Sequence, residues 1–102
     1  MHPLPKLAFD YRIEDFQRFE GEEVEFGAVP EAVKVRLDSV TQLRSPSFLT
    51  RPGFSLNFST DYSVQLLGGI YEMRVSSSEV YSIYVEPVLF VGNRRKYQSV
   101  FF

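Results

Sequence analysis

The chain has 102 residues, a formal net charge of −2, no cysteine and a single histidine, His2. This length fits one domain, and the lack of cysteine excludes disulfides, thiolate metal sites and cysteine nucleophiles. The histidine lies beside the chain start, where segments tend to fray, which disfavours a histidine-based triad or metal cluster. We therefore expect a single non-enzymatic domain with no cofactor and no bound metal.

Residues 1–12 are expected to form an extended arm, because Pro3 and Pro5 disfavour a helix. The apolar residues of this arm are Leu4, Leu7, Phe9 and Tyr11. The last three share one side of an extended chain, as a strand that adds to the sheet edge of another chain requires. We therefore predict that the arm binds another chain. The alternative is that it packs on its own domain and covers an edge strand.

The segment after the arm predicts a short helix over residues 13–20. Ile13, Phe16 and Phe19 recur at a spacing of three, which places them on one helix face. Gly21 follows, and glycine is the usual residue just past a helix end. Because so short a helix is not stable alone, its apolar face must pack on the rest of the domain.

From Val24 onward the apolar residues recur with a period of two, which is typical of strands with one buried face. The predicted strands are residues 24–29, 33–43, 54–60, 69–76, 79–90 and 95–102. Gly92-Asn93 predicts a tight hairpin between the last two strands. The residues expected to face inward are Val35, Leu37, Phe54, Leu56, Phe58, Tyr71, Met73 and Val75. Six short strands predict one all-β domain over residues 13–102, either a sandwich or a small barrel.

Several strand-and-turn patterns resemble those of a family of small bacterial proteins of unknown function. The shared segments include Ile13-Glu14-Asp15-Phe16, Val35-Arg36-Leu37, Phe54-Ser55-Leu56-Asn57-Phe58, Ile83-Tyr84-Val85-Glu86-Pro87-Val88 and Tyr97-Gln98-Ser99-Val100-Phe101-Phe102. The resemblance implies an all-β domain, and the family is loosely associated with genes for phage-tail-type collar and fibre proteins. It therefore implies an assembly or accessory role, and it supplies no catalytic residue.

Two charged clusters have both a chemical and a structural interpretation. The four glutamates within residues 20–25 are of the type used in acid–base catalysis or calcium binding, but they lack the alternating Asp/Asn pattern of a calcium loop. The basic run at residues 94–96, with aromatic neighbours, fits single-stranded nucleic acid. The net charge of −2 instead favours a solvated hairpin tip. We therefore interpret both clusters as solvated surface and expect no nucleic-acid partner.

Ten phenylalanines and six tyrosines are more rings than we expect one core of this size to hold. The surplus predicts a subunit contact or a ligand cavity, and an aromatic-rich core is the alternative. The interface candidates are Leu4, Leu7, Phe9, Tyr11, Tyr84 and Phe102. We therefore expect a structural or assembly module that contacts copies of itself or a larger tail-like or fibre-like particle. The alternative is a soluble β-barrel that binds a small apolar ligand.

The sequence also carries expectations about location. The first residues contain one lysine and no long apolar run, so we predict synthesis in the cytoplasm without a signal peptide. No apolar stretch approaches the roughly 20 residues that a helix needs to cross a bilayer. A role in assembly would place the protein finally in an assembled particle.

Overall fold

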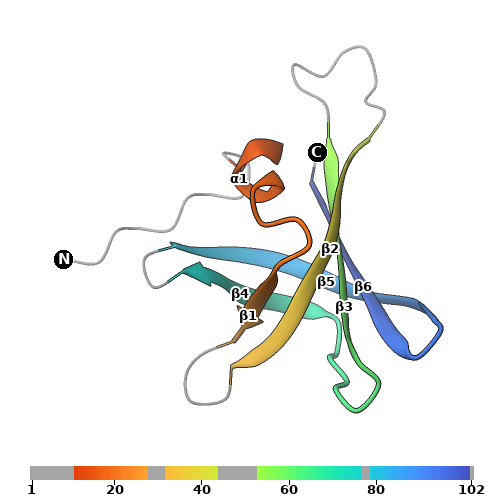
Figure 1. Cartoon of the computed structure of the whole chain (residues 1–102). Coiled ribbons are helices and arrows are strands. Elements are labelled where there is room, and N and C mark those ends of the chain that lie inside the picture. Colours follow the sequence, from red (N-terminus) through yellow and green to blue (C-terminus); the bar gives the residue numbers. More distant parts are fainter. Residues whose placement is uncertain (1–10, 28–31, 44–52, 77–78, 102) are drawn as a thin grey trace.

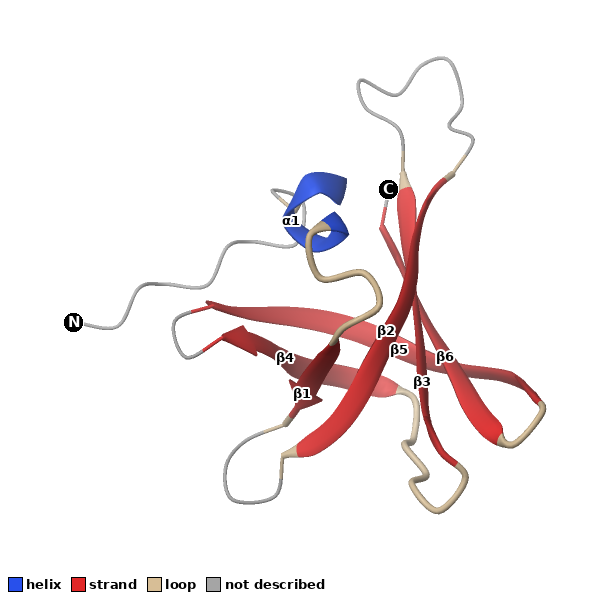
Figure 2. Cartoon of the chain, in the orientation of Figure 1, coloured by secondary structure: helices blue, strands red, loops and turns tan. Residues whose placement is uncertain are grey.

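The computed structural model describes residues 11–27, 32–43, 53–76 and 79–101. These residues form six strands and one short helix, whose arrangement is shown in Figures 1 and 2. The predicted all-β class is confirmed. The elements in chain order are α1 (Ile13–Gln17), β1 (Glu23–Phe26), β2 (Val33–Gln42), β3 (Phe54–Asp61), β4 (Gly69–Ser76), β5 (Glu79–Val91) and β6 (Arg94–Phe101).

The sheet is a closed barrel, which decides between the two predicted architectures. Its strand order is β1-β2-β3-β6-β5-β4, and every neighbouring pair is antiparallel. The shortest ladder joins β1 to β4, where Glu25 lies opposite Arg74 and Phe26 opposite Met73. A hydrogen bond of 2.9 Å from the Gly27 N–H to the Glu72 carbonyl continues this ladder. The barrel therefore closes through backbone pairing between its first and fourth strands.

The helix α1 is shorter than the predicted residues 13–20. It begins where the Arg12 N–H donates to the Asp15 carboxylate at 3.0 Å and ends at Gln17. The bonds from the Phe19 N–H to the Phe16 carbonyl at 2.9 Å and from the Glu20 N–H to the Gln17 carbonyl at 3.2 Å then span three residues each, as in a turn. Gly21, with φ of 84°, then redirects the chain towards β1.

The hairpin at Gly92-Asn93 forms as predicted. Val91 lies opposite Arg94, so two residues make the turn. Gly92 has φ of 66°, a conformation that glycine adopts without a side-chain clash.

The alternating strand residues meet inside the barrel. Six of the eight predicted inward residues are buried, namely Val35, Leu37, Phe54, Leu56, Phe58 and Met73. The other two, Tyr71 and Val75, are half-buried and pack against this core. The inward face of each of these strands was therefore predicted correctly.

Candidate functional site

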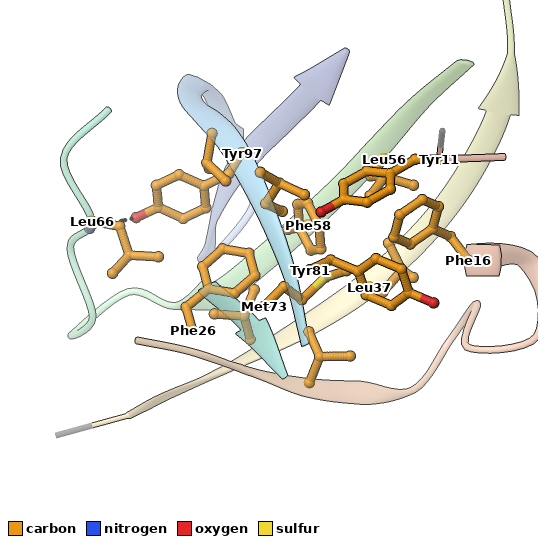
Figure 3. Close-up of a cluster of buried hydrophobic side chains, with 14 of the residues drawn as sticks. Tyr11, Phe16, Phe26, Leu37, Leu56, Phe58, Leu66, Met73, Tyr81 and Tyr97 are labelled. Atoms are coloured by element: carbon orange, nitrogen blue, oxygen red, sulfur yellow. Dashed lines mark hydrogen bonds between the residues drawn. The ribbon is translucent and has the colours of Figure 1, made fainter. Parts of the chain in front are cut away.

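The barrel interior is packed with its own side chains, and Figure 3 shows part of this cluster gathered between the strands. Leu37, Leu56, Phe58, Met73 and Val85 are all 0% exposed. An internal chamber large enough for water would leave accessible surface on its walls. These positions therefore form a packed core rather than the walls of a ligand chamber.

Most of the aromatic side chains in the described part of the chain belong to this core or pack against it. Towards one end, the Phe26 ring lies 5.0 Å from that of Phe58 and 5.5 Å from that of Tyr71. The hydroxyl of Tyr97, a buried residue of β6, accepts a hydrogen bond of 3.0 Å from the Leu66 N–H. Of the interpretations left open for the aromatic residues, an aromatic-rich core accounts for these rings.

The second aromatic group closes a gap in the barrel wall. Among the described residues, the ladder between β5 and β6 stops at Glu86 opposite Gln98. Beyond that point the Tyr11 ring lies between the strands, 5.2 Å from the Tyr81 ring of β5 and 5.9 Å from the Phe101 ring of β6. The Tyr11 hydroxyl accepts a 2.9 Å hydrogen bond from the Ser82 N–H. A tyrosine side chain thus takes the place of a strand partner.

The position of Tyr11 corrects one prediction. The residue was assigned to an arm that contacts another chain, yet it is only 1% exposed and belongs to the core of its own domain. Its ring and hydroxyl both find partners at the gap between β5 and β6. The domain therefore begins at or before Tyr11. The interface candidates Leu4, Leu7, Phe9 and Phe102 lie outside the described residues.

A polar cluster beside Tyr11 ties α1 to β5. Arg18 forms an ion pair with Glu79, and the Tyr81 hydroxyl donates to the same carboxylate at 3.0 Å. Burial, together with the hydrogen bond to Glu79, raises the pKa of Tyr81 to about 12. The phenol therefore stays protonated at neutral pH and acts as a hydrogen-bond donor rather than as a nucleophile.

The outer side of β2, β3 and β6 carries a polar network. The Ser59 hydroxyl donates to Asp38 at 3.0 Å and accepts from Arg94 Nε at 2.9 Å. Lys96 Nζ lies 3.2 Å from the second oxygen of Asp38, and Arg94 lies 3.3 Å from Asp61. Ser59 is 0% exposed although it lies on the outer face. This side of the barrel is covered by its own long side chains.

The outer side of β4 and β5 carries an exposed apolar pair. Ile70 and Tyr84 lie opposite each other in the ladder, and they are 75% and 55% exposed. Tyr84 was an interface candidate from the sequence, whereas Ile70 was missed. A signal was present, because Ile70 precedes Tyr71 within one strand, and two consecutive apolar residues of a strand cannot both face inward.

The charged clusters of the sequence lie in the barrel wall and the turns beside it. Glu20 accepts a hydrogen bond of 3.3 Å from a backbone N–H of β2, and Glu23 lies 3.9 Å from Lys34 Nζ. In the basic run, the Arg95 guanidinium lies 4.6 Å above the Tyr62 ring. Within the described ranges, no three His, Cys, Asp or Glu side chains gather where they could hold a metal ion.

A family model described as "Domain of unknown function (DUF6916)" matches residues 11–101. The chain belongs to this family. The family match starts at Tyr11, the residue that closes the gap between β5 and β6. No curated protein and no solved structure matches the chain. In the part of the chain that the structure describes, no helix is long and apolar enough to cross a membrane.

Proposed function

We propose that this domain is a non-enzymatic assembly module that acts through protein–protein contacts on the outside of its barrel. The observation that carries the proposal is the exposed pair of Ile70 and Tyr84 on β4 and β5. Tyrosine is enriched at protein interfaces, and the buried centre of an interface is more apolar than the rest of the protein surface. Since the interior is filled by its own side chains, apolar contacts with a partner are available on the outer face.

The polar groups of the barrel support a structural role. The Ser59 hydroxyl and Asp38 bind each other and their cationic neighbours, while Tyr81 and Glu79 hold α1 against β5. A catalytic group must reach a substrate, and each of these groups is already bound to a neighbour in the same domain. Their arrangement favours stability of the barrel over chemistry.

A finer form of the proposal is a component or accessory of a tail-like or fibre-like particle, as the family resemblance suggests. Two copies that pair symmetrically through the exposed face of Ile70 and Tyr84 form a closed dimer. A particle that grows beyond a dimer therefore needs a second, different contact. We assign this second contact to residues 1–10, which carry Leu4, Leu7 and Phe9 directly before the anchored Tyr11. The two contacts together would allow extension beyond a dimer.

Native mass measured across protein concentrations tests the proposal, with the full chain compared with a variant that lacks residues 1–10. The full chain is expected to form oligomers larger than a dimer. The truncated chain should remain folded, because it keeps Tyr11, and should stop at the dimer. A full chain that is monomeric at every concentration would contradict the proposed function. A truncated chain that unfolds would place residues 1–10 in the domain itself and remove them as an assembly contact.

A further inference from the structure

The outer face of β4 and β5 carries acidic and small residues in a regular arrangement around an apolar pair. The two strands run side by side as a long ribbon (Figure 1). In the central row Ile70 lies opposite Tyr84, and in the next outward-facing row Glu72 lies opposite Ser82. An exposed acid, Glu72, and a small hydroxyl residue, Ser82, thus flank the apolar pair on one side.

The row on the other side of the apolar pair has the reverse arrangement. Gly68 lies level with Glu86, because a Cβ built on Gly68 would be 3.6 Å from the Val85 carbonyl and 3.5 Å from the Pro87 side chain. Glu86 is exposed and shares the outer face with Tyr84, two residues earlier in β5. The two acids therefore occupy one diagonal of the face, and the two small residues, Gly68 and Ser82, occupy the other.

This diagonal pattern determines what meets when two copies of the face are stacked about a two-fold axis. With the axis along the strands, Glu72 of one copy lies over Ser82 of the second copy, and Glu86 lies over Gly68. With the axis across the strands, Glu72 lies over Gly68 and Glu86 over Ser82. In both orientations apolar residues meet apolar residues, and each acid meets a small uncharged residue. Like charges, which oppose association, never face each other directly.

We propose that the outer β4–β5 face docks onto the same face of a second copy of this chain, with the row of Ile70 and Tyr84 at its centre. The inference rests on the proposed function, and it identifies the first of the two contacts that the proposed assembly needs. Two-fold pairing of identical patches is the commonest form of soluble assembly, and it requires a patch that can face a copy of itself without opposing like charges. The apolar row excludes water at the centre, while Glu72 and Glu86 stay at the rim.

The interface is small, so the dimer is expected to be weak. A stable interface covers about 800 Å² on each partner, and three rows of two strands supply less than this. The dimer should therefore dissociate on dilution through the micromolar range. A contact of this strength suits a module whose final assembly is completed by the second contact at residues 1–10.

Charge substitutions at Ser82 test the pairing, because Ser82 meets an acid of the second copy in both orientations of the axis. Ser82→Lys should tighten the dimer by about 2- to 5-fold, and added salt should reduce this gain. Ser82→Glu should weaken the dimer by a similar factor. Sedimentation velocity over a concentration series gives the dissociation constants. Both variants keep the Ser82 N–H that binds Tyr11, so the fold should be retained.

A pair of tyrosine variants supplies the matched control. Tyr84→Ser should weaken the dimer by about 10-fold or more, as expected for a central aromatic residue. Tyr62→Ser removes a tyrosine of nearly equal exposure, 58% against 55%, from the turn after β3, and should leave the dissociation constant unchanged. If both tyrosine variants weaken the dimer equally, the loss is not specific to the β4–β5 face and the inference is wrong.

The outcomes separate this inference from the function on which it rests. An oligomer that responds to Ser82→Lys and Ser82→Glu in opposite directions supports the inference. An oligomer that forms but ignores both Ser82 variants overturns the inference and leaves the assembly function standing on another surface. A full chain that is monomeric throughout the series overturns both.

Discussion

Two sides of the same barrel invert the usual relation between polarity and exposure. On β2, β3 and β6 the polar Ser59 is 0% exposed, whereas on β4 and β5 the apolar Ile70 is 75% exposed. Both residues point outward from their strands. The comparison shows that exposure on a barrel wall is decided by neighbouring side chains as much as by the residue itself.

The neighbours explain the difference. Ser59 accepts a hydrogen bond from Arg94 and lies opposite Lys96 in the ladder between β3 and β6, and the charged ends of these two side chains reach Asp61 and Asp38. Beside the exposed pair lie Gly68 and Ser82, which are too short to cover a neighbour, and Glu72 and Glu86, which leave the pair exposed. The first side is completed by the chain itself, and the second is left for a partner. Four predictions test this contrast. The effect of a substitution in the buried interior is the reference against which the effects on the two outer sides are compared.

The interior should show the largest effect. Leu56→Ala removes a side chain that is 0% exposed, and the resulting cavity is expected to cost about 2–5 kcal/mol of unfolding free energy. Chemical denaturation of the two proteins measures the difference. Leu67→Ala, at a leucine that is 75% exposed, is the matched control and should change the stability by less than about 0.5 kcal/mol. An unchanged denaturation midpoint for Leu56→Ala would mean that the strand register is wrong.

The polar side should show an intermediate effect. Ser59→Ala removes the hydroxyl that joins Asp38 to Arg94, and leaving these partners short of one hydrogen bond should cost about 1–2 kcal/mol. Ser63→Ala, in the exposed turn after β3, is the control and should have little effect. If the two serine variants are equally stable, the polar network does not contribute to the unfolding free energy. The two sides of the barrel would then not differ in how they stabilise the domain.

Tyr81 should make stability depend on alkaline pH. Its pKa is raised to about 12, so the unfolded chain, with an ordinary tyrosine pKa near 10, ionises first. The contribution of Tyr81 is therefore fully present below about pH 10 and is lost as the pH rises to about 12. Tyr81→Phe should flatten this part of the stability profile. Tyr84→Phe, on the outer face, is the comparison, and an equal flattening in both variants would contradict the assignment to Tyr81.

The apolar side should show the smallest effect on stability. Ile70→Ser changes a side chain that is already 75% exposed, so the unfolding free energy of the monomer should change by less than about 0.5 kcal/mol. Self-association should nevertheless weaken, because the same side chain lies in the central row of the proposed dimer. Thermal unfolding at low concentration and sedimentation at high concentration measure the two quantities separately. A large loss of monomer stability would show that Ile70 serves its own domain, and the contrast between the two sides would then fail.

The strands were largely predictable from local patterns. Alternation of Phe54, Leu56 and Phe58 with polar residues placed β3 correctly, because a half-buried strand requires a period of two. Gly92-Asn93 located the last hairpin, because its backbone conformation suits glycine. The six strands, their inward faces and the short helix were thus available from the sequence by itself.

Long-range geometry decided the rest. Closure of the barrel depends on β1 meeting β4 some fifty residues later, and no local pattern records which strands meet. Tyr11 resembled the apolar residues of the arm, yet it fills a gap left where the β5–β6 ladder ends. The exposure of Ile70 and the burial of Ser59 also emerged only in three dimensions. Local periodicity determines which way a side chain points, whereas the neighbours that cover it come from distant parts of the chain and are fixed only when the barrel closes.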